Sequence, residues 1–228
     1  MSPLVIVIIV VVFGACAYFS IYMSKKSKGI MEKYNQPEYY KNAPTYLDEF
    51  MNDRFDLIKK QMQGAPIDAF TQCAYITTLS NKAKSVAATA AKTVAWAAVG
   101  VKARYNEADH AAFLVLSGEE LHYIFFEEGE AKQHLIFDRL RLLNAKKGEL
   151  SSTEKVTRVS SLMGRTNHKL IIDIDGESID LIYYDKVERY PDSTLVMEKS
   201  AFDTMGKFKL MGTYFKDQFY KKYSHLSN

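Results

Sequence analysis

The chain has 228 residues, with 30 Lys and Arg against 27 Asp and Glu, so its formal net charge is only +3. So small an imbalance argues against a protein that binds nucleic acid through its overall charge. The two cysteines, Cys16 and Cys73, cannot build a disulfide framework because Cys16 lies inside an apolar segment. The class of small disulfide-stapled domains is therefore excluded.

The first segment, residues 3–23, contains no formally charged side chain and includes a β-branched run at 5–12. As an α-helix it would be about 30 Å long, which is the thickness of the hydrocarbon core of a bilayer. The sequence therefore predicts a single-pass transmembrane anchor at 1–24.

Three lysines follow this segment at once: Lys25, Lys26 and Lys28. The positive-inside rule places such a cluster on the cytoplasmic side, so we expect the N-terminus outside and the C-terminal domain in the cytosol. The alternative is lipidation and cleavage at Cys16, because residues 12–16 loosely resemble a bacterial lipobox, although no basic residue precedes the apolar run. Small residues at 16, 20 and 24 also offer a face for pairing with a second copy, against the simpler interpretation of a single anchor.

Residues 25–44 are polar and rich in tyrosine, and we interpret them as a juxtamembrane linker. A helical region is predicted at 45–106. Its first part, 46–63, is an amphipathic helix that packs on the domain or on a second copy, and it ends at a Gly-Ala-Pro sequence. Its apolar positions recur at three- and four-residue spacing: Leu47, Met51, Phe55, Ile58 and Met62.

The second part of this region, 69–106, contains no acidic residue and is rich in alanine. A helix centred on 83–101 would carry one face of small apolar residues, which suits close packing on a neighbouring helix. The functional alternative is a helix lying on an anionic lipid surface or a partner. The residues that would make these contacts are Lys82, Lys84, Lys92, Trp96, Lys102 and Arg104.

From residue 111 the pattern becomes extended, with glycine turns between short apolar runs. The predicted strands are 113–117, 121–126, 133–137, 140–143, 155–162, 169–174 and 178–184. An amphipathic helix with an aromatic stripe follows at 201–223, and we expect this stripe to close the open end of a curled sheet. The glycines at 206 and 212 weaken this helix intrinsically, so packing must hold it.

About seven antiparallel strands followed by a C-terminal helix resemble the bacterial pleckstrin-homology-like (PH-like) and GRAM-type superfold. The residues that carry the resemblance are the hairpin at 113–126, the hairpin at 169–184 and the helix. It implies an α+β protein with a PH-like domain at 107–228. Phosphoinositide-binding members place basic residues around the first strand-to-strand loop, whereas the corresponding loop here contains Glu119 and Glu120. Other members bind protein segments, so fold alone does not choose between these uses.

No catalytic, cofactor-binding or metal-binding residue is predicted. The histidines at 110, 122, 134, 168 and 225 lack metal-ligand spacing, and Cys73 has no histidine near it in sequence. A basic loop is the candidate for partner binding: Arg139, Arg141, Lys146 and Lys147.

The leading hypothesis is therefore a membrane-anchored, non-catalytic binding or scaffolding module with a protein partner. The alternatives are a lipid-binding module that uses the basic stretch 82–104, and an enzyme whose site is assembled from residues distant in sequence.

Overall fold

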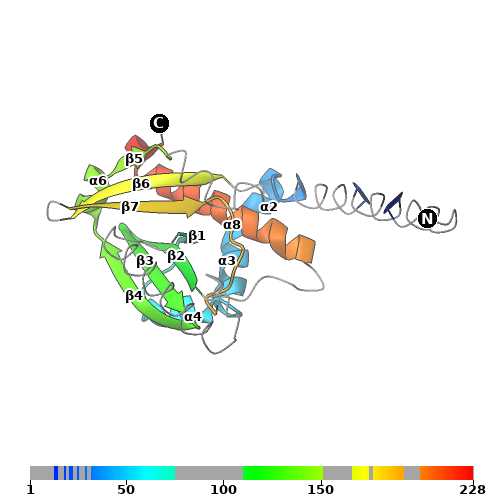
Figure 1. Cartoon of the computed structure of the whole chain (residues 1–228), viewed down its shortest axis with the longest axis horizontal. Coiled ribbons are helices and arrows are strands. Elements are labelled where there is room, and N and C mark those ends of the chain that lie inside the picture. Colours follow the sequence, from blue (N-terminus) through cyan, green and yellow to red (C-terminus); the bar gives the residue numbers. More distant parts are fainter. Residues whose placement is uncertain are drawn as a thin grey trace, which may run out of the picture.

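The computed structural model describes residues 32–74, 110–150, 166–174, 177–192 and 201–227, with seven single positions between 13 and 29. These residues form a mixed α+β structure with a seven-stranded antiparallel sheet and a long C-terminal helix (Figure 1). Several predictions lie outside the described residues: the helix at 83–101, the strand at 155–162, and most of the anchor.

The strand order in the sheet is β4-β3-β2-β1-β7-β6-β5, and every pair of neighbours is antiparallel. The central strand is therefore the first in the chain, and both sheet edges come from the middle of the chain. The strands are β1 (Ala69–Cys73), β2 (His110–Ser117), β3 (Glu120–Glu127), β4 (Glu130–Phe137), β5 (Lys146–Gly148), β6 (Asn167–Ile174) and β7 (Glu177–Tyr184).

Two sequence predictions are wrong here. Ala69–Cys73, expected within a helical region, form β1, which is buried along its whole length. A strand covered on both faces lacks the alternation of apolar and polar residues that identifies strands in a sequence. Residues 140–143, expected to be a strand, belong to helix α6 (Arg139–Asn144), because the Asp138 carboxylate accepts the Arg141 N–H and caps the helix.

Further helices among the described residues are α2 (Pro37–Lys41), α3 (Ala43–Met51), α4 (Asp56–Gln61), α8 (Ala201–Lys222) and the 3₁₀ helix η3 (Ser224–Leu226). The helix predicted at 46–63 is thus split between α3 and α4 by a turn. All five of its predicted apolar positions are buried, and they pack on the sheet of the same chain. This confirms that the amphipathic segment covers the domain.

The sheet has apolar groups on both faces, which β2 illustrates. Phe113 and Val115 face the cluster formed with α3 and α4, whereas Leu114 and Leu116 face a second cluster that α8 closes. Helix α8 contributes to both clusters, and its predicted aromatic stripe is confirmed as core by the burial of Phe208, Phe215, Phe219 and Tyr223.

The linker predicted at 25–44 is wrong from Tyr34 onward, because Tyr34 is only 3% exposed and packs on α8. Its hydroxyl donates to Asp203 Oδ1 at 2.6 Å. Its ring lies over Gly206, where an added Cβ would stand 2.3 Å from a ring carbon. At Gly212 an added Cβ would lie 2.1 Å from the carbonyl carbon of Asp185. Both helix glycines are therefore positions of close approach.

Candidate functional site

Only part of the predicted site residues lies in the part of the chain that the structure describes. No helix among the described residues is long and apolar enough to cross a membrane. Lys25 is described and exposed, while Lys26 and Lys28 lie outside the described residues. The basic residues of 82–104 and Trp96 also lie outside them. The predicted partner-binding loop at 139–147 is described completely.

This loop forms α6 and most of β5. Helix α6 connects β4, which is one edge strand of the sheet, to β5, which is the other. Helix α6 contains three leucines, and only Leu142 points into the core, where it is fully buried. Leu140 is 71% exposed and Leu143 is 47% exposed. Residues three apart share one face of a helix, so these two leucines form one outward apolar face.

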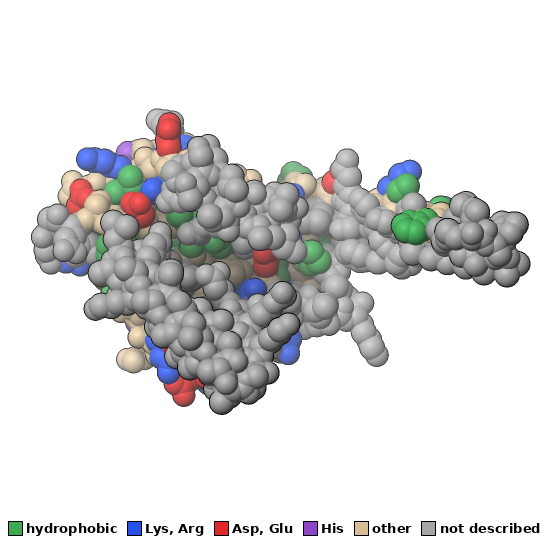
Figure 2. Space-filling view, in the orientation of Figure 1, with side chains coloured by type: hydrophobic (Ala, Val, Ile, Leu, Met, Phe, Trp, Pro, Cys, Tyr) green, Lys and Arg blue, Asp and Glu red, His purple; other side chains and the backbone are tan. Residues whose placement is uncertain are grey.

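Basic side chains lie around this face. Arg139 donates from one Nη atom to both carboxylate oxygens of Glu119, at 2.9 and 3.0 Å, so its charge is compensated. Arg141, Lys146 and Lys147 form no ion pair with another described residue, and both lysines are exposed. Figure 2 shows basic and apolar side chains beside one another over α6 and β5, with some acidic groups among them. We call Leu140, Leu143, Arg141, Lys146 and Lys147 the far surface.

The sequence identified the charges of the far surface but missed its two leucines. In the predicted strand Leu140 and Leu143 would have faced opposite sides of the sheet, so they would not have formed one surface. The available signal was Asp138, which is a favoured N-cap residue placed directly before an Arg-Leu-Arg-Leu-Leu sequence.

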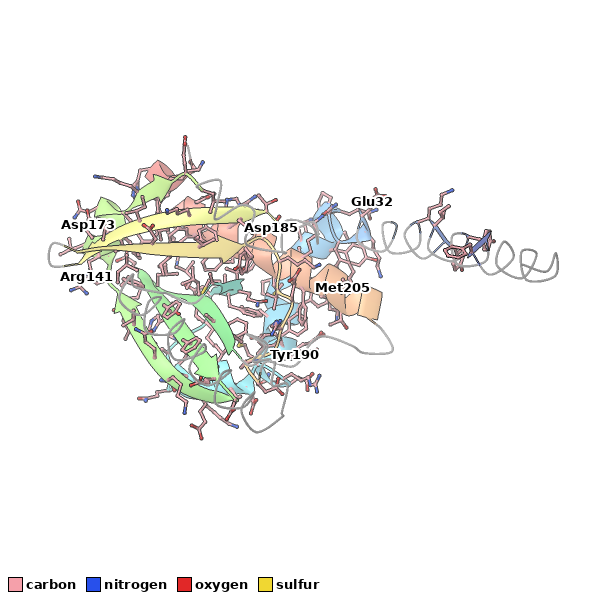
Figure 3. The ribbon with its side chains drawn as sticks, viewed as in Figure 1. Glu32, Arg141, Asp173, Asp185, Tyr190 and Met205 are labelled. Atoms are coloured by element: carbon pink, nitrogen blue, oxygen red, sulfur yellow. The ribbon has the colours of Figure 1, made fainter. Side chains whose placement is uncertain are left out.

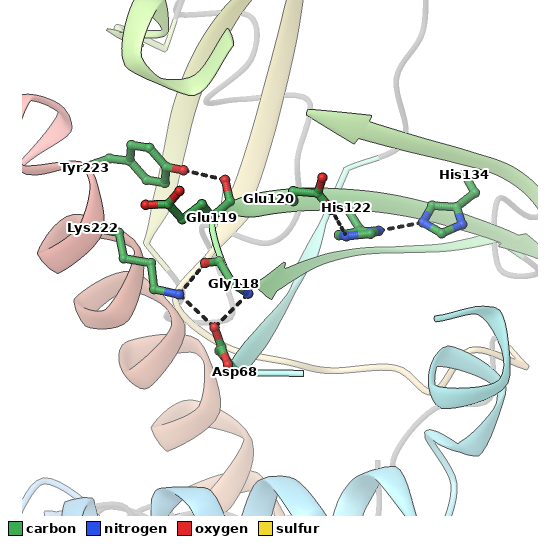
Figure 4. A network of polar contacts seen from close by, with 8 residues as sticks. All are labelled: Asp68, Gly118, Glu119, Glu120, His122, His134, Lys222 and Tyr223. Carbon is green, nitrogen blue, oxygen red and sulfur yellow. Dashed lines mark hydrogen bonds and ion pairs between the residues drawn. The ribbon is translucent and has the colours of Figure 1, made fainter. Parts of the chain in front are cut away.

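The turn between β2 and β3 is fixed to the end of α8 (Figure 4). Tyr223 donates its hydroxyl to the Glu119 carbonyl at 2.6 Å, and Lys222 pairs with Asp68 at 2.7 Å and contacts the Gly118 carbonyl. The Asp68 carboxylate also accepts the Gly118 N–H at 2.9 Å. These contacts hold Glu119 in place as the partner of Arg139.

This turn is not the first strand-to-strand loop that the resemblance assumed. Because β1 is Ala69–Cys73, the turn with Glu119 joins the second and third of the described strands. Glu119 and Glu120 therefore do not decide whether the first loop binds a phosphorylated ligand.

A chain of polar side chains runs from α4 to β3. The Gln61 amide nitrogen lies 3.2 Å from His134 Nδ1, and His134 Nε2 lies 2.9 Å from His122 Nδ1. His122 Nε2 lies 3.5 Å from a Glu120 carboxylate oxygen. If Gln61 donates, His134 donates to His122, and the remaining His122 N–H points at Glu120. Both imidazoles are then neutral, in agreement with burial, which lowers the pKa of each.

Other groups considered for chemistry lie within the sheet, where Tyr183 of β7 pairs in register with Cys73 of β1 and with His168 of β6. Cys73 is buried in the core cluster that α8 closes. His168 stacks on Tyr183, and burial lowers the pKa of His168 while it raises that of Tyr183. In the part of the chain that the structure describes, no group of three or more His, Cys, Asp or Glu could hold a metal ion.

A shallow depression of about 400 Å³ lies on α3 and α4. Its charged groups pair with one another, since Lys60 and Asp56 are 2.6 Å apart. It is lined by Met51, Asn52, Asp56, Lys59, Lys60, Gln63 and Gly64.

No protein-family model, curated protein or solved structure matches this chain.

Proposed function

We propose that this protein is a membrane-anchored, non-catalytic binding module that holds a PH-like domain at the cytosolic face of a membrane. The observation that carries the proposal is a sheet of seven antiparallel strands followed by a helix that closes one face of it. This is the architecture that the resemblance implies, and β1 supplies a strand that the sequence pattern had concealed.

Attachment close to the apolar segment gives the domain an orientation. Tyr34 is buried against α8, so eight residues separate Lys25 from Tyr34 in the body of the domain. Figure 3 places Glu32 and Arg141 at opposite ends of the domain. With the anchor preceding Glu32, the far surface would point away from the membrane and into the cytosol.

The apolar run is tested by two arginine substitutions, Ile8→Arg with Val11→Arg, in the full chain. Each arginine near the centre of a spanning helix costs about 2.5–3.5 kcal/mol, so we expect the variant to leave the carbonate-resistant membrane fraction. Ile8→Leu with Val11→Leu is the matched control and should stay in it. Equal fractionation of both variants would remove the anchor from the proposal.

A second candidate function is binding to anionic lipid through the basic stretch 82–104. The position of β1 favours it, because this stretch then belongs to the first strand-to-strand connection, where phosphoinositide-binding members of the superfold place basic residues. Replacing the lysines of this stretch by glutamate in the full chain should abolish the preference for vesicles with anionic lipid while the protein stays folded. Unchanged binding would exclude this function. The residues to replace are Lys82, Lys84, Lys92 and Lys102.

A further inference from the structure

We infer that the far surface docks a segment of a protein partner that carries both acidic and apolar side chains. The inference rests on the proposed function, because an anchored module would present this surface to the cytosol. It goes further by naming the surface and the chemistry of the partner.

The far surface is held rigidly by the fold. Leu142 and Ala145 are buried in the core on the inner side of this segment, and Asp138 caps the start of α6. Lys146 and Lys147 belong to β5, which pairs with Leu170 and Ile171 of β6. A partner therefore meets a preformed surface and orders little of the chain on binding, which favours affinity.

The apolar part of the surface is the exposed face of α6. Leu140 and Leu143 are among only three large apolar side chains exposed in the described residues from 32 onward, and the third, Ile136, lies just before α6 at the end of β4. Single exposed leucines are ordinary, but neighbouring ones on one face are typical of an interaction site. A partner that covers them gains from burial of apolar area.

The charged part of the surface selects the sign of the partner. Arg139 is engaged with Glu119, which leaves Arg141, Lys146 and Lys147 as cations without an ion-pair partner among the described residues. The carboxylates on the same segment are Asp138, which caps α6, and Glu149. An acidic partner segment complements this arrangement, and a basic one is repelled.

Two other occupants fit less well. An anchor that precedes Glu32 would place the membrane at the end of the domain where Glu32 lies. Arg141 and the far surface lie at the opposite end (Figure 3). A second copy of the chain would bring the same cations against each other in a two-fold interface. A different protein with acidic groups meets neither obstacle.

The test uses the full chain in nanodiscs of zwitterionic lipid and a displayed library of random 16-residue peptides. We expect selection to enrich peptides with net negative charge and several apolar residues. Their binding should weaken about tenfold or more in the Leu140→Ser, Leu143→Ser variant, as truncation of a central apolar contact does. Lys146→Glu with Lys147→Glu should weaken binding by a similar factor at low salt. At high salt this double substitution should have a smaller effect, because salt screens the interaction between exposed charges.

The matched control is Lys59→Glu with Lys60→Glu, which makes the same change of charge on α4 and should leave binding unchanged. Enrichment of neutral or basic peptides would overturn the inference. Peptide affinity that is the same for the unaltered chain and for both far-surface variants would also overturn it. So would self-association or capture of anionic vesicles that depends on Leu140. The far-surface substitutions lie outside the apolar segment 3–23, so the variants should stay in the membrane fraction whether or not the peptides bind. A failed peptide test is therefore distinguishable from a failed test of the membrane anchor.

Discussion

Gly206 and Tyr34 provide the sharpest test of how the N-terminal part of the chain joins the domain. Gly206 lies inside α8, where replacing glycine by alanine normally stabilises a helix by about 1 kcal/mol. Here an added Cβ would stand 2.3 and 2.5 Å from two ring carbons of Tyr34. Overpacking of this kind costs about 1–3 kcal/mol and the helix preference offsets about 1 kcal/mol of it, so we expect Gly206→Ala to lower the free energy of unfolding by up to about 2 kcal/mol.

In a Tyr34→Ala background the obstacle is removed. The same Gly206→Ala change should then raise the free energy of unfolding by about 1 kcal/mol, since only the helix preference remains. The coupling between the two positions is therefore about 1–3 kcal/mol, measured by denaturant unfolding of the four proteins in detergent. Tyr34→Phe is the control, because it keeps the ring and loses only the hydrogen bond to Asp203. If Gly206→Ala is stabilising by the same amount in both backgrounds, Tyr34 does not pack on α8 as described.

Three further results are expected from unfolding measurements. Gly212→Ala should destabilise by more than Gly206→Ala, because the added Cβ would meet backbone atoms at 2.1–2.4 Å, which cannot rotate away. Leu142→Ala should cost about 2–5 kcal/mol, whereas Leu140→Ala, at an exposed site, should change stability by less than about 0.5 kcal/mol; equal costs would mean that α6 is turned differently. Burial lowers the pKa of His122, His134 and His168, so the unfolded chain binds protons first as pH falls below about 6.5, and stability should decline from there toward pH 5. His134→Asn should reduce that decline and leave the part that comes from His168, and an identical pH profile would argue against the buried histidine pair.

The elements with a clear period were predictable from the sequence. The apolar positions of 46–63 are buried as their spacing indicates, and so is the aromatic stripe of α8. The hairpin of β6 and β7 has the register that its apolar runs and central turn imply. In each of these segments one face is apolar, so the pattern carries the information.

The wrong predictions for β1 and Tyr34 have a common physical origin, which is packing against residues that are distant in the sequence. β1 has no visible period because α8 and the α3–α4 layer bury both of its faces. Tyr34 looks like part of a polar linker because the glycine that accommodates its ring lies 172 residues further along the chain. The two leucines of the far surface could not be assigned a direction until Asp138 was known to begin a helix. A local pattern holds none of the information about β1 and Tyr34, whereas the N-cap residue Asp138 was a local signal for α6.

The most direct test of the anchored module is the accessibility of two single cysteines in intact cells of a bacterial host. Ser2→Cys and Lys147→Cys are introduced separately into the full chain after both native cysteines have been replaced, and a membrane-impermeant maleimide is added. Ser2→Cys should be labelled in intact cells, and Lys147→Cys only after the membrane has been permeabilised. Labelling of Lys147→Cys in intact cells, or loss of the Ser2→Cys label through cleavage of the N-terminal segment, would contradict a cytosolic domain held by an N-terminal anchor.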